Sequence, residues 1–290
     1  MRPARSLLAA FAVLTLSASA QTADPVARVF HPSAPLPSYD VATIKPAVSL
    51  TNPNGMMLVR GTTVREYIRD AYAPTFARLA PAQVIGGPEW IDKDRYTIDG
   101  KAPPDLEVAM QKMRTDEKTP QQHMMEQSLL ADRFHLKVHF EVREMPIYAL
   151  VPAKGGLRIK PVDAPAPRDP GSPPPPPSPN APLPAGTMMT FVAPGGLRMV
   201  RAGATTMTGL VRLLSGEISD RPIIDQTGFT GYFDINNMKW AAFGSAAPSD
   251  SLDLPSLGTA LEETLGIKLV ATKGPVEVVV IDSIDRPSPN

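Results

Sequence analysis

The candidates for metal binding or catalysis in this 290-residue sequence begin with its four histidines, two of which lie close together. His135 and His139 alternate with apolar residues, as expected for one face of a β-strand, and Glu141 continues that face. Side chains on one face of a strand are about 7 Å apart per two-residue step, too far for both histidines to bind one tetrahedral zinc ion. We therefore predict a solvated strand face, with no metal site and no cofactor.

Aspartates are the other candidates for acid–base chemistry. Asp225 and Asp234 lie at predicted turns and strand ends, where aspartate commonly accepts hydrogen bonds from backbone amides. The sequence contains no cysteine and no Gly-x-Ser-x-Gly motif, so nucleophilic catalysis has no support. The enzyme alternative that remains is a secreted hydrolase with an unrecognised site, whose candidate residues are Asp225, Asp234, His135 and His139.

Four aromatic residues, Trp90, Tyr96, Phe229 and Tyr232, are the candidates for ligand or partner binding. They occur in two similar stretches, residues 84–101 and 221–240, where glycine-rich turns separate short apolar runs. Aromatic rings in such places can contact a ligand, but they can equally fill a core. The sequence leaves both interpretations open.

The helices expected to position these residues have recognisable ends. Thr63, Thr206 and Ser256 can each cap a helix, and Gly266 is placed to end the last one. Two further helices are predicted at residues 106–114 and 120–132, between the stretch 84–101 and His135.

The strands are predicted from alternating apolar residues and from turn composition. Residues 134–142 are expected to form a hairpin with residues 147–151, after Glu144-Met145-Pro146. Residues 267–271 and 276–284 are expected to form a second hairpin, joined by Thr272-Lys273-Gly274-Pro275.

Composition and the first residues indicate an exported protein. Residues 1–20 contain two arginines, an apolar run and small residues at positions 18 and 20, which is typical of a signal peptide cleaved after Ala20. Without these residues, 27 basic side chains face 29 acidic ones, a balance that argues against a nucleic-acid partner. We expect no membrane span in the mature chain and a periplasmic or extracellular location.

The order of elements suggests a duplicated α+β unit. Residues 21–37 are predicted to be a disordered lead, 38–162 a first α+β module and 187–286 a second, followed by a short tail at 287–290. Each module would have a small antiparallel or mixed sheet with two helices on one face. Residues 163–186, rich in proline, are predicted to be an extended linker between the modules.

The chain resembles a family of uncharacterised secreted proteins of soil acidobacteria, classed as a domain of unknown function. The matching motifs are spread over most of the mature chain: residues 39–46, 86–91, 129–134, 146–151, 154–156, 221–234 and 273–277. The resemblance implies a binding or sensing role outside the cytoplasm and assigns no catalytic residue. Each half is also loosely similar to the short α+β modules of secretins and TonB-dependent receptors.

From the sequence we therefore expect a non-enzymatic binding or interaction protein. Its partner would be an envelope protein or a small ligand, bound at sheet edges or in a cleft between the modules.

Overall fold

The structure, a computed structural model, describes residues 26–31, 35–47, 49–51, 57–59, 61–75, 77–113, 115–164, 183, 187–193, 196–218, 220–241 and 254–287. The predicted signal peptide and most of the proline-rich segment lie outside these residues. The fold is α+β, as expected, with several small sheets and six α-helices in the described part.

The helices are α1 (Val64–Ala71), α2 (Trp90–Lys93), α3 (Pro104–Lys112), α4 (Thr115–Phe134), α5 (Met207–Glu217) and α6 (Leu257–Leu265), with one 3-10 turn, η1 (Pro81–Gln83). The strands are β1 (Val41–Pro46), β2 (Ser49–Thr51), β3 (Met57–Val59), β4 (Thr62–Thr63), β5 (Val84–Gly86), β6 (Arg95–Lys101), β7 (Lys137–Pro152), β8 (Pro161–Val162), β9 (Thr187–Ala193), β10 (Leu197–Thr205), β11 (Ile223–Asp225), β12 (Tyr232–Ala241) and β13 (Ile267–Ser283).

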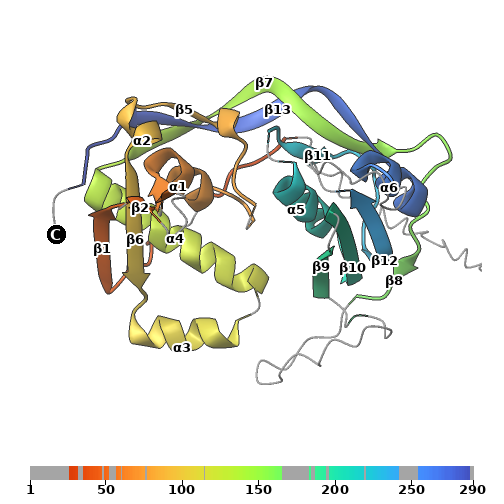
Figure 1. The fold of residues 1–290 in the computed structure, drawn as a ribbon, viewed down its shortest axis with the longest axis horizontal. Coiled ribbons are helices and arrows are strands. Elements are labelled where there is room, and N and C mark those ends of the chain that lie inside the picture. The colour runs from red at the N-terminus through yellow and green to blue at the C-terminus, as the bar shows by residue number, and fades with distance from the viewer. Residues whose placement is uncertain are drawn as a thin grey trace, which may run out of the picture.

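Two long antiparallel strands, β7 and β13, run through the whole molecule and join its two halves (Figure 1). The two predicted hairpins are therefore wrong, because each is one continuous strand whose partner is the other. Short strands flank this pair in a sheet of order β11-β7-β13-β5, and both flanking strands are parallel to their neighbours.

Prolines inside β7 and β13 explain why the sequence suggested turns. Pro146 is two residues before Tyr148, so its backbone nitrogen points to the same side of β7. The N–H of Tyr148 points away from β13 and donates to the carbonyl of Pro222. Pro275 is likewise two residues before Glu277, whose N–H points away from β7 and donates to the carbonyl of Ala27. The missing N–H of each proline therefore lies on the outer edge, where no hydrogen bond of the β7–β13 ladder is lost.

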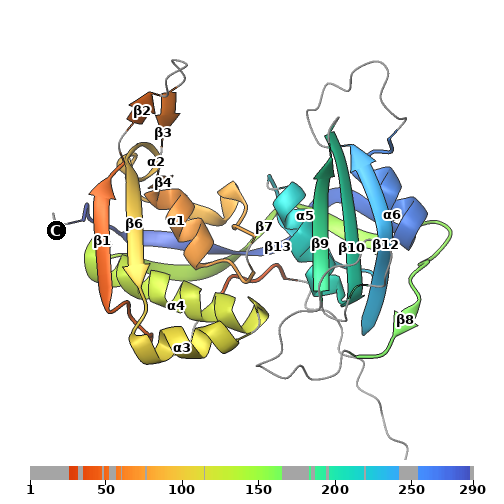
Figure 2. The ribbon, with the colours of Figure 1, turned by 60° about the horizontal axis from the view of Figure 1, so that its bottom comes forward.

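The first half contains the sheet β1-β6-β4 with α1, α3 and α4 beside it (Figures 1 and 2). Helix α1 begins as predicted: the Thr63 hydroxyl accepts from the N–H of Glu66, and the Glu66 carboxylate accepts from the N–H of Thr63. This capping box satisfies two backbone donors at the start of the helix. The hydrogen bond from the Thr63 backbone also lowers the pKa of Glu66.

The second half contains the sheet β8-β12-β10-β9, with α5 and α6 packed behind it (Figure 2). Thr206 and Ser256 cap α5 and α6, and Gly266 ends α6 in the left-handed conformation, as predicted. Strand β8 joins this sheet before the proline-rich segment, and β9 joins it afterwards. Both ends of that segment are therefore attached to the same sheet, and β7 and β13 make the crossing between the halves.

Each half completes its core with a strand that continues from the other. Val279, Ile281 and Ile284, at the end of the chain, are buried with α1 and α4 in the first half. Leu150 of β7 is buried with α5, α6 and β12 in the second half. Segments from both predicted modules thus contribute to both cores.

The two halves also share local geometry at equivalent places. Glu144 of β7 and Pro275 of β13 are partners in the ladder. Four residues after each of them a short parallel strand begins to pair: β11 at Tyr148 and β5 at Val279. Gly61 and Ala204 have positive φ two residues before the caps of α1 and α5. These correspondences are consistent with a duplication, which remains an interpretation.

Candidate functional site

The histidine candidates lie on the exposed surface near the start of β7. His139 has Asp282 at 2.8 Å and Glu141 at 3.1 Å, and these hydrogen bonds raise its pKa. His135 ends α4 with a positive φ and has Asp285 at 3.2 Å. Each histidine is thus paired with carboxylates of its own. Across the described ranges, no three histidine or acidic side chains are grouped so as to hold a metal ion.

The aspartate candidates have local structural roles in the second half. Asp225 accepts from the backbone N–H of Thr227 at 2.9 Å and from its hydroxyl at 2.7 Å, which fixes the turn after β11. Asp234 accepts from the N–H of Ala204 at 2.8 Å. Asp225 is opposite Leu150, eleven residues along β7 from His139, or roughly 35 Å of strand. The structure therefore does not bring the four hydrolase candidates into one site.

Two of the aromatic candidates, Trp90 and Tyr96, both contact Arg286. The Arg286 guanidinium lies 5.0 Å from the centre of the Trp90 ring, and its Nε donates to Asp94 at 3.1 Å. Arg286 also hydrogen-bonds to Tyr96, whose pKa is nevertheless raised, mainly by burial. Tyr96 is buried, with its ring edge-on to Phe134. These contacts fasten the last described residues to the first half.

The other two aromatic candidates lie in the second half. Phe229 packs on the core of that half with its ring edge-on to Phe233, 5.5 Å between centres. Tyr232 begins β12 and pairs with Val162 of β8. The four aromatic residues therefore occupy two separate places.

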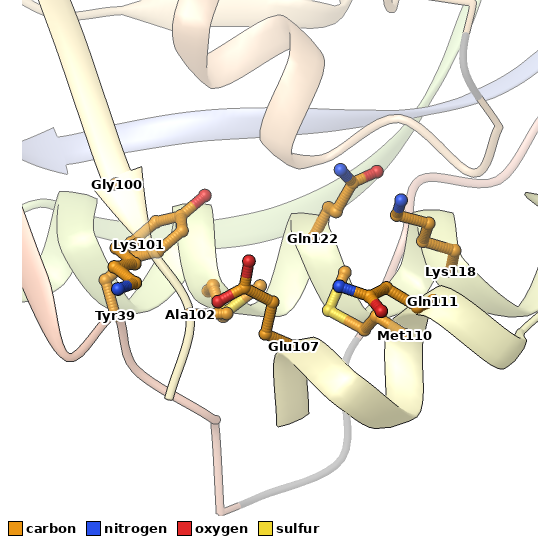
Figure 3. A pocket seen from close by; sticks show the side chains of 10 residues that line it. Tyr39, Gly100, Lys101, Ala102, Glu107, Met110, Gln111, Lys118 and Gln122 are labelled. Carbon is orange, nitrogen blue, oxygen red and sulfur yellow. The ribbon is translucent and has the colours of Figure 1, made fainter. Parts of the chain in front are cut away.

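The structure shows a cavity that the sequence did not indicate. It has a volume of about 370 Å³ and lies in the first half, between the end of β6 and helices α3 and α4 (Figure 3). Its lining residues are Tyr39, Gly100, Lys101, Ala102, Glu107, Met110, Gln111, Lys118, Gln122 and Met125. This volume lies within the range of small-molecule sites, whereas the lining is more polar than is usual for them.

Helices α3 and α4 carry six of the ten lining residues, and the others come from Tyr39 and the end of β6. Lys118, Gln122 and Met125 are three and four residues apart on α4 and share one face of it. In Figure 3, Tyr39 and Lys101 lie at one end of the cavity and Lys118 at the other, with Glu107 between them. The Tyr39 ring packs so closely on Gly100 that an added Cβ there would be 2.7 Å from it.

A buried polar cluster lies behind the Tyr39 end. The hydroxyls of Tyr39 and Tyr67 share a hydrogen bond, and burial raises the pKa of Tyr39 to about 12 and that of Tyr67 further. Glu126 follows the lining residue Met125 on α4, and its charge acts on both hydroxyls. Burial, with the charge of Asp70 as a second cause, raises the pKa of Glu126 to about 7.

Sequence reasoning missed Glu126, although one signal was present. Met125, Leu129 and Leu130 are buried around it on the same helix, so a charged residue interrupts an apolar stripe at helical spacing. Tyr39 lies in the family motif at residues 39–46, which gives no indication of a binding site. No sequence pattern showed that α3 would fold across α4 and leave a cavity.

Fold and site together define an α+β protein of two halves, joined by a shared strand pair and carrying a small-molecule-sized cavity. The chain belongs to the family DUF3738, proteins of unknown function, whose model matches residues 65–284. This confirms the resemblance to an uncharacterised family, while the acidobacterial association and the secretin analogy remain predictions. No curated protein and no solved structure matches the chain. Within the described residues, no helix is long and apolar enough to span a membrane.

Proposed function

We propose that the protein is an exported, non-enzymatic binding protein whose small ligand occupies the cavity between β6, α3 and α4. The observation that carries this proposal is the cavity itself, about 370 Å³ and lined by charged, amide, aromatic and thioether groups. Such a mixture can both cover an apolar ligand surface and fix its polar groups. Export rests on the signal peptide predicted for residues 1–20.

A binding role fits the chemistry of the lining better than catalysis does. Glu107 and Lys101 are exposed side chains, which can orient a polar ligand but are well hydrated. The hydrolase candidates lie outside the lining, and two of them, Asp225 and Asp234, accept hydrogen bonds from backbone amides. Ligand binding requires only that the cavity walls stay in place.

The test is to block the cavity and follow ligand retention. The full chain would be incubated with a mixture of small metabolites, washed, and analysed by native mass spectrometry. Gln122→Trp fills the cavity from α4 and should abolish any retained mass. Gln226→Trp makes the same change at an exposed site in the second half and should retain the ligand as wild type does. Equal retention by both variants would place the ligand elsewhere and overturn the proposal.

A further inference from the structure

One carboxylate oxygen beside the cavity has no partner. Oε2 of Glu126 is buried and forms no hydrogen bond within the described part of the chain. A buried polar atom without a partner is costly and is uncommon in native proteins, except where a ligand or ordered water completes it. Glu126 directly follows the lining residue Met125 and is one turn after Gln122 on α4, and its charge acts on the hydroxyl of Tyr39, so this carboxylate lies near the Tyr39 end of the cavity.

Glu126 has an acidic neighbour. Among the described groups, Asp70 has a resolved charge effect on the Glu126 carboxyl, and its charge has the same sign. Asp70 already has a cationic partner, because Arg78 donates to both of its oxygens at 2.6 and 2.7 Å. The local charge balance thus favours an added cation.

The side chains near Glu126 at this end of the cavity suit a cationic group. Tyr39 lines the cavity and Tyr67 adjoins it through the shared hydrogen bond. The faces of tyrosine rings attract cations, most strongly where water is excluded. Met125 also lines the cavity, and a methionine side chain is flexible enough to adapt to a bound group beside it.

We infer that the cavity binds a small zwitterionic ligand, with its amino group against Tyr39 and Glu126 and its anionic group at Lys118. This rests on the proposed function, since it names the ligand class of the same cavity. Lys118 is half-buried at the opposite end from Tyr39 and can bind a carboxylate there (Figure 3). Lys101, near Tyr39, is exposed and keeps its ammonium group in water.

Four probes of one chain length test the inference: 5-aminopentanoate, pentylammonium, pentanoate and pentanol. Calorimetric titration of the full chain at pH 8, where Glu126 is ionised, should give the highest affinity for 5-aminopentanoate. Glu126→Gln should weaken 5-aminopentanoate and pentylammonium by about tenfold, the usual effect of losing a charged hydrogen-bond partner, and leave pentanoate unchanged. Lys118→Gln should weaken 5-aminopentanoate and pentanoate but not pentylammonium.

Glu262→Gln is the matched control, an exposed glutamate on a helix of the other half, and should bind all four probes as wild type does. Equal affinity of wild type for amino and non-amino probes, or no effect of Glu126→Gln, would overturn the zwitterion inference. If metabolites are retained in a Gln122-dependent manner but no probe binds, the proposed function stands and the ligand class is wrong. If nothing is retained and no probe binds, both fail.

Discussion

At the scale of single residues, Glu126 shows how a position with a chemical role can also be a weak point in stability. Its carboxyl is buried beside two tyrosine hydroxyls and has no cationic partner in the described structure that lowers its pKa. A group in this environment favours its neutral form, because the charged form loses hydration. We therefore expect stability and the proposed ligand binding at this position to depend on pH in opposite ways.

The first prediction concerns this pH dependence. The pKa of Glu126 is about 7 when folded, above its ordinary value of 4.5, so the protein loses stability as the pH rises from about 4.5 to 7. A difference of this size corresponds to at most about 3 kcal/mol. Glu126→Gln, which cannot ionise, should be more stable than wild type at pH 8 and about equal to it at pH 4.5.

Denaturant unfolding at the two pH values measures this effect. Glu262→Gln should follow wild type at both. The same stability difference between wild type and Glu126→Gln at both pH values would contradict the assigned ionisation.

A second residue-scale prediction concerns the two helix ends that precede β7 and β13. Gly266 has a φ of 65°, and a Cβ there would collide with the carbonyl of Gly156 and lie 2.7 Å from the N of Arg158. Gly266→Ala should therefore destabilise the protein by about 2–4 kcal/mol. His135 has a φ of 47° at the equivalent place, so His135→Gly should stabilise it by about 1 kcal/mol. Melting temperatures measure both, and equal effects of the two changes would contradict the assignment.

At the scale of elements, local signals predicted the helices well. Threonine or serine caps and the C-terminal glycine are set by neighbouring backbone atoms, and α1, α5 and α6 begin as expected. The long strands were not predictable in this way. Pro146 and Pro275 lie in stretches whose composition is typical of turns. Only the pairing with a strand far along the chain shows that no ladder hydrogen bond is lost at these prolines.

The candidate site was largely beyond sequence prediction for a similar reason. Its lining comes from residue 39, the end of β6, α3 and α4, and their contacts are determined by tertiary packing. The residues singled out from the sequence were those in dense motifs, such as Phe229 and Asp225. The structure shows that these have local packing and turn roles.

The helix caps give the element-scale prediction. Thr63 both accepts from Glu66 and donates its backbone N–H to the Glu66 carboxylate, whereas the Thr206 side chain accepts one hydrogen bond, from Gly209. Thr63→Ala and Thr206→Ala should each destabilise the protein by about 1 kcal/mol, and serine at either site should restore most of it. Urea unfolding of the four variants measures this. If serine proved as destabilising as alanine, packing of the threonine methyl group would be the cause.

At the scale of the whole molecule, the halves are joined by two long strands, β7 and β13, each of which contributes to both halves. Strand β5 of the first half pairs with β13, and β11 of the second half pairs with β7. Ile147 and Val278, one from each long strand, are fully buried in a small apolar cluster where the two strands cross the centre. A duplication followed by strand exchange would give this arrangement, because each half contributes one long strand and one short one.

The corresponding prediction is that neither half folds alone. A chain cut between Gly155 and Gly156, in an exposed turn, leaves the first fragment without Val279, Ile281 and Ile284 of its core. It leaves the second fragment without Leu150. Separately the fragments should show no cooperative thermal transition by near-ultraviolet circular dichroism, and mixing them should restore one. A cooperative transition in either fragment alone would show that the cores are independent.

The position of β13 also determines when the protein can fold. It is the last strand of the chain, and β7, its partner, is more than a hundred residues earlier. Pairings over such separations form slowly, because a long loop must close first. During synthesis the first half emerges before β13, so we expect its core to remain incomplete until β13 has been made. If the chain is exported, as we propose, this delay would keep the polypeptide competent for translocation.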